Sequence, residues 1–246
     1  MKMQTLAAAA VATIIAGIAT PTLAATYSGN GGTGFSGPIG GSTLTVTESG
    51  TNVNFSLATG ATFNSNALII YVDSIDGAGA NSNSTFTDVA DGGRRAISGL
   101  SDSGRSLVTF PTAFGADFAL TLEPGSFSGT FNLSTPSSFG FVQGNGLAGT
   151  GTGPFTFSVA KASLGLPATG AFDFDFVGTL ISTSGYRSNE TIGVSTTVPG
   201  SAGDAPNAGN TGTQVFTTAN NFAVVPEPAS LGLIGLAGVA LLRRKR

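Results

Sequence analysis

Apolar and polar residues alternate with a period of two along most of this chain. Leu44 and Val46 share one face of residues 42–48, and Phe172, Phe174 and Phe176 share one face of residues 172–176. Successive side chains of a β-strand point to opposite faces, so this pattern predicts strands with one buried and one solvated face. The same alternation occurs at residues 52–58, 117–123, 127–133 and 154–160.

Residues 67–72, ALIIYV, form a continuous apolar run, which predicts a strand covered on both faces. Between the two ends of the chain, no apolar stripe with a helical period competes with these strands. Gly, Ser, Thr and Asn fill most of the remainder, as in proteins built from short strands and tight turns. The sequence therefore predicts an all-β fold over residues 25–222, an antiparallel two-sheet sandwich of the jelly-roll type.

Three connecting segments stand out by composition. Gly50 lies between two alternating segments and suits a short hairpin. Residues 28–41, SGNGGTGFSGPIGG, predict a flexible lead-in, and residues 197–213 predict a long loop. We expect the residues after Phe222 to form a short spacer.

The chain has no Cys, no His and no Trp. These absences exclude disulfides, thiol nucleophiles and Cys-ligated zinc or iron–sulfur centres. They also exclude a Ser-His-Asp triad and a His-rich metal site.

The N-terminus has the order of a secretory signal peptide. Lys2 precedes an apolar stretch at residues 6–19, and the small residues PTLAA follow. This order predicts a signal peptide at residues 1–24 that is cut after Ala24. The alternative is an uncut membrane anchor, for which the stretch is short.

The C-terminus has the features of a stop-transfer segment. Residues 229–242 are 14 apolar or small residues, about 21 Å as a helix against a hydrocarbon core of about 30 Å. Counting from Phe222 gives 21 residues, about 31 Å. The basic cluster that follows would stay in the cytoplasm: Arg243, Arg244, Lys245 and Arg246. The alternative, an amphipathic surface helix, lacks a polar face.

Residues 225–246, VPEPASLGLIGLAGVALLRRKR, closely resemble the PEP-CTERM sorting signal. The resemblance implies that Pro226, Glu227 and Pro228 are the recognition element and that residues 243–246 are the retention element. It also implies a membrane-embedded exosortase as processing partner, the inner membrane as the site of anchoring before processing, and bacteria that make extracellular polysaccharide. We assign residues 223–246 to this segment.

The region between the two terminal signals is acidic. Residues 25–225 contain 12 acidic and 5 basic residues, a net charge of −7. A negative body argues against nucleic acid or anionic lipid as a partner.

The body also resembles the β-sandwiches of DOMON-like and family-9 carbohydrate-binding-module-like domains. The segments that carry this resemblance run from ALIIYVDS, through GADFALTLEPGS and FTFSVAKASLGL, to SGYRSNETIG, roughly residues 65–195. It implies a domain that binds sugars, or haem in some relatives. Haem does not suit this chain, which has no His and whose two Met residues, Met1 and Met3, lie in the signal peptide.

Two groups of polar side chains are candidates for a catalytic site or a metal site. Asp173 and Asp175 share one strand face about 6.6 Å apart, as in a glycosidase pair, although a solvated strand face explains them more simply. Asp73, Asp76, Asn81 and Asn83 offer oxygen ligands for calcium, although their spacing does not fit an EF-hand and an ordinary polar turn is the simpler interpretation.

Two further groups have structural alternatives. Asp88 and Asp91 lie close enough in sequence to Arg94 and Arg95 to be neutralised by them. Tyr186 is an aromatic residue on an expected loop and, with Arg187 beside Glu190, is a candidate glycan contact. A ring packed on the rim of the sandwich is the alternative.

These observations predict an exported, non-enzymatic protein of the cell surface or of an exopolysaccharide matrix, without a cofactor unless calcium binds. A carbohydrate-binding module is the main alternative, and a glycoside hydrolase is a further one.

Overall fold

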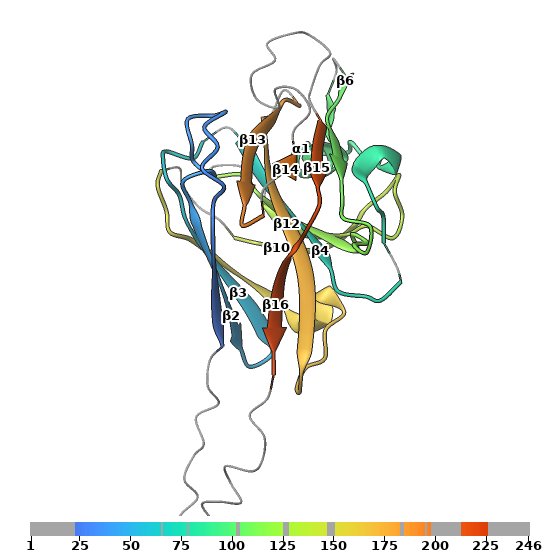
Figure 1. The fold of residues 1–246 in the computed structure, drawn as a ribbon. Helices are drawn as coiled ribbons and strands as arrows, with labels where there is room; N and C mark the ends of the chain where they lie inside the picture. The colour runs from blue at the N-terminus through green and yellow to red at the C-terminus, as the bar shows by residue number, and fades with distance from the viewer. Residues whose placement is uncertain are drawn as a thin grey trace, which may run out of the picture.

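The computed structural model describes residues 23–64, 66–77, 79–101, 104–124, 128–146, 151–182, 185–194, 196–197 and 213–225. The predicted signal peptide up to residue 22, most of the predicted long loop and the tail from residue 226 lie outside these ranges. Within them the chain is mostly antiparallel β-structure, as the alternation predicts (Figure 1).

Two sheets form the body. The smaller sheet has four strands in the order β1 (Ala24–Ser28), β2 (Thr43–Ser49), β3 (Asn52–Ala58) and β11 (Phe155–Ala160). The larger has the order β10 (Gly140–Gly144), β9 (Gly129–Asn132), β8 (Phe118–Leu122), β4 (Asn66–Asp73), β12 (Phe172–Ser182) and β13 (Arg187–Ile192). β16 (Asn220–Val224) also pairs with β12.

The connections include two consecutive meanders, β1–β2–β3 in one sheet and β8–β9–β10 in the other. A jelly roll is built from Greek-key connections, so these meanders do not confirm the jelly-roll part of the prediction. The predicted hairpin at Gly50 is confirmed: Ser49 pairs with Asn52, and Gly50 adopts a positive φ of 57°.

The main core lies between the two sheets. Val53, Phe55 and Leu57 on β3 are buried in it, and so are Phe155, Phe157 and Val159 on the neighbouring β11. The rings of Phe55 and Phe157, which are paired in register, stack 4.9 Å apart. The alternating phenylalanines thus form the core that the sequence predicts.

β4 is covered on both faces, as its continuous apolar run predicts. Leu68, Ile70 and Val72 join the main core, while Ile69 and Tyr71 belong to a second core on the other face of the larger sheet. The smaller elements of the fold are η1 (Asn83–Thr85), α1 (Gly92–Ser98), β5 (Leu100–Ser101), β6 (Gly104–Arg105), β7 (Leu107–Thr109), η2 (Lys161–Leu164), β14 (Thr196–Thr197) and β15 (Thr213–Phe216).

The glycine-rich lead-in is held in place by Glu190, contrary to the prediction of a flexible segment. The buried carboxylate accepts hydrogen bonds from the backbone N–H groups of four residues in the lead-in: Phe35, Gly37, Ile39 and Gly40. A Cβ at Gly40 would lie 1.8 Å from the Gly32 carbonyl oxygen, so close packing requires glycine there. The many glycines of this segment therefore allow backbone segments to pack closely and do not make the segment mobile.

β16 corrects the predicted boundary of the body. Phe222 and Val224 are buried in the main core and pair with Phe174 and Phe172 of β12. While the body is folded, residues 222–224 therefore contribute neither to a spacer nor to a membrane span counted from Phe222. Among the described residues, no helix is both long and apolar enough to span a membrane.

Candidate functional site

The structure brings the two groups of candidate aspartates into one acidic groove. Asp73 ends β4, Asp76 follows in the next loop, and Asp173 and Asp175 lie at the start of β12. Together with Ala113 and residues 165–167 after η2, these side chains line a groove of about 350 Å³. In Figure 1 this region lies where η2 meets the start of β12. The sequence predicts each pair separately but does not predict that they meet.

Strand register places two carboxylates opposite each other in this groove. Asp73 on β4 is the direct partner of Asp175 on β12. Like charges at directly opposed positions of a sheet repel each other. The Asp175 carboxylate accepts a hydrogen bond of 2.7 Å from Asn221 Nδ2, and Asp73 accepts one of 2.8 Å from the Gly115 backbone N–H.

Burial shifts the protonation of Asp73 in the groove and of Asp117 near it. Burial raises the pKa of Asp73, the Gly115 hydrogen bond opposes this shift, and the charges of Asp117, Asp175 and Asp76 raise the pKa further. Burial also raises the pKa of Asp117, against hydrogen bonds from the Ser74 and Ile75 backbone N–H groups. Asp73 in the groove and Asp117 near it thus accept protons more readily than free aspartate does.

The predicted calcium ligands do not all converge, because Asp73 and Asp76 line the groove whereas Asn83 lies elsewhere. Asn83 is buried, where its side chain donates to the carbonyls of Ser98 and Ser106 and accepts from the Val108 backbone N–H. Within the described ranges, no group of three or more His, Cys, Asp or Glu side chains is arranged to hold a metal ion. Asn83 therefore serves the second core rather than a cation site.

Asp88 and Asp91 are neutralised as the sequence predicts, by Arg94. Arg94 Nε lies 3.2 Å from Asp88 Oδ2, and Arg94 also pairs with Asp91. Asp91 caps α1 by accepting from the Arg94 backbone N–H, and Asp88 accepts from the Phe139 backbone N–H. These contacts give both aspartates a structural role.

Of the two candidate glycan contacts, only Tyr186 has a side chain that solvent can reach. Tyr186 is partly buried, whereas Arg187 begins β13 and has no exposed surface. The prediction that Arg187 contacts a glycan from an exposed loop is therefore wrong, because strand pairing with β12 carries its side chain into the second core. Phe141 on β10 is 53% exposed and is an aromatic surface that the sequence analysis missed.

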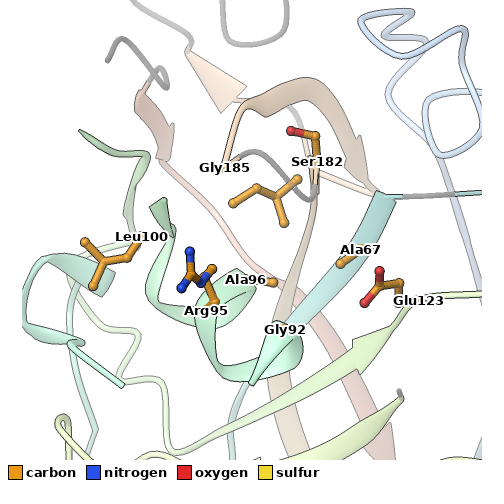
Figure 2. A pocket seen from close by; sticks show the side chains of 9 residues that line it. Ala67, Gly92, Arg95, Ala96, Leu100, Glu123, Ser182 and Gly185 are labelled. Atoms are coloured by element: carbon orange, nitrogen blue, oxygen red, sulfur yellow. The ribbon is translucent and has the colours of Figure 1, made fainter. Parts of the chain in front are cut away.

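A second pocket is too small for a sugar. It lies between α1 and the end of β12 and has a volume of about 60 Å³. Figure 2 shows Arg95 and Glu123 on opposite sides of it, with Ser182 and Gly185 above. A space of this size suits a few waters at most.

The comparison with known protein families decides the nature of the C-terminus. Residues 224–246 are a PEP-CTERM protein-sorting motif. This finding confirms the resemblance seen in the sequence and implies sorting to the cell surface by an exosortase. The motif begins at Val224, the last residue of β16, so it follows the folded body without an intervening spacer.

The comparisons with curated proteins and with solved structures find no significant match. The resemblance of the body to DOMON-like and family-9 carbohydrate-binding-module-like domains therefore stays a prediction.

Proposed function

We propose that this protein is an exported, non-enzymatic component of the cell surface or of an exopolysaccharide matrix, held in the inner membrane by its tail before processing. The PEP-CTERM motif that directly follows β16 is the observation that carries this proposal. The acidic charge of the body and the substantial core on both faces of the larger sheet fit a stable cargo outside the cell.

Replacement of the sorting triplet tests this proposal. A chain with Pro226→Ala, Glu227→Ala and Pro228→Ala should accumulate in the membrane at its unprocessed mass, while the wild-type chain reaches the surface with a shorter tail. Cell fractionation and intact-mass measurement report both outcomes. Pro199→Ala with Pro206→Ala is the control and should be sorted normally. Wild-type sorting of the triplet variant would overturn the proposal.

The acidic groove supports carbohydrate binding as a second candidate function. Its four aspartates offer acceptors for sugar hydroxyls, and its volume of about 350 Å³ admits a short saccharide segment. Calorimetric titration of the protein with matrix polysaccharide should then give heat that Asp173→Asn with Asp175→Asn abolishes. Thr47→Ala, on the outer face of the smaller sheet, should bind normally. Absence of heat with the wild-type protein would remove this candidate.

Glycoside hydrolysis is a third candidate, favoured by the raised pKa of Asp73 opposite Asp175. A general acid needs such a raised pKa, and a second carboxylate must lie nearby. Asp175→Asn should then abolish turnover of glycosides. If the pure wild-type protein hydrolyses no glycoside, this candidate is excluded.

A further inference from the structure

Arg187 is a fully buried cation whose hydrogen-bond partners are neutral. Its Nε donates to Ser106 Oγ over 3.3 Å, and its Nη1 donates to Thr179 Oγ1 over 3.1 Å. Its Nη2 is buried and has no acceptor among the residues that the structure describes. The guanidinium therefore lies in the second core, where no described residue balances its positive charge or uses this donor group.

The polar side chains around Arg187 are neutral, and each of them also has another partner. The Thr179 hydroxyl contacts Gln214 Oε1, and Gln214 Nε2 donates to the Ser188 carbonyl. The Tyr71 hydroxyl donates to the Ile97 carbonyl over 2.6 Å, and its oxygen also interacts with the Arg187 guanidinium. These neighbours come from β4, β12 and β15, and none of them carries a negative charge at neutral pH.

The acid nearest to Arg187 in sequence is not its counter-ion. Glu190 lies three residues further along β13, so its side chain points to the opposite face of the strand. Its carboxylate is occupied by the N–H groups of the lead-in. In the part of the chain that the structure describes, Arg94 and Lys161 form ion pairs, whereas Arg187 forms none.

Burial lowers the pKa of Arg187, and the interaction with Tyr71 only partly offsets this shift. An arginine nevertheless keeps its proton in a protein. Taking an unpaired charge out of water is strongly unfavourable, and a water molecule at Nη2 would supply an acceptor without balancing the charge.

We propose that Nη2 of Arg187 binds a small monovalent anion of the size of chloride, within the second core. Such an ion would accept hydrogen bonds from both N–H groups of Nη2 and neutralise the charge of the guanidinium. The site is independent of sorting and of the acidic groove, so its failure or success says nothing about the proposed function.

The thermal stability of the full-length chain in detergent tests this site. Chloride is titrated against gluconate, which is too large for the core, at constant ionic strength. If chloride binds the folded state, raising it to about 100 times its Kd should raise Tm by roughly 5–10 °C. An equal Tm in the two salts would overturn the proposal.

Arg187→Met should remove this chloride response. Arg105→Met is the matched control, because Arg105 also donates to neutral acceptors, the carbonyls of Asn83 and Phe86, but is partly exposed. The control variant should keep the wild-type response to chloride. A chloride response that survives in Arg187→Met would contradict the assignment.

Bromide provides a test that needs no variant. Crystals of the wild-type protein grown with bromide in place of chloride should show an anomalous peak within hydrogen-bond distance of Arg187 Nη2. Peaks confined to the protein surface, or a water at that position, would exclude an anion at Arg187.

Discussion

Glu190 shows how one buried carboxylate can order a glycine-rich segment. Four backbone N–H groups and the Ser188 hydroxyl donate to it. Glu190→Gln replaces one acceptor oxygen by an amide that faces these donors, so we expect a loss of about 3 kcal/mol in the free energy of unfolding. Urea unfolding of the wild-type protein and the variant measures this loss. Asp173→Asn, at an exposed carboxylate, should change stability by less than about 0.5 kcal/mol, and an equal loss in both variants would contradict this role.

Asp73, which is partly buried among other carboxylates, predicts an unusual pH dependence of stability. Because the folded pKa of Asp73 lies above its ordinary value of 3.8, the folded state holds a proton that the unfolded state has released. The contribution of Asp73 to the free energy of unfolding is fully present below pH 3.8. It is lost as the pH rises through the pKa that Asp73 has in the folded state. Asp73→Asn should therefore raise Tm at pH 7 and flatten the fall of Tm above pH 4.

A double-mutant cycle measures the contribution of Asp175 to this pH dependence. Asp73→Asn and Asp175→Asn each relieve the same repulsion, so the double variant should gain less in Tm than the sum of the two single gains. Additive gains would show that the two carboxylates do not interact. Circular dichroism melts between pH 4 and pH 7 supply all the required values.

At the scale of the element, the strands follow from local pattern, whereas their partners do not. Alternation at residues 52–58 and 154–160 predicts β3 and β11 and the faces that they bury. The pairing of Asp73 with Asp175 joins strands about one hundred residues apart, and no local signal encodes that register. The acidic groove depends on this register and was therefore not predictable as a single site.

Two of the elements that the sequence analysis missed show why. α1 has seven residues, too few for a helical period to appear, and is marked instead by its cap at Asp91 and by Gly99 with a φ of 67°. β16 was not recognised, and its last two residues were assigned to the spacer, because its apolar residues run into those of the tail. Its pairing with β12 shows that Phe222 and Val224 belong to the core.

At the scale of the whole molecule, both ends of the described body lie at one pole. β1 leaves this pole and β16 returns to it, and Tyr27 Oη donates to the Asn221 carbonyl over 2.6 Å between them. β16 ends at Val224, two residues before the sorting triplet. While the tail is inserted, as we propose, this pole should therefore face the membrane and the opposite pole should point away from it (Figure 1).

Single cysteines at the two ends of β3 test this orientation, because the natural chain has none. Thr51 and Ala58 are both exposed, and Thr51 lies at the pole of the chain ends. Seven residues of strand separate them by about 23 Å. In liposomes that contain the full-length protein, a fluorophore on Thr51→Cys should be quenched by nitroxide-labelled headgroups, and one on Ala58→Cys should not. Equal quenching at the two positions, or stronger quenching at residue 58, would mean that the pole of the chain ends does not face the bilayer.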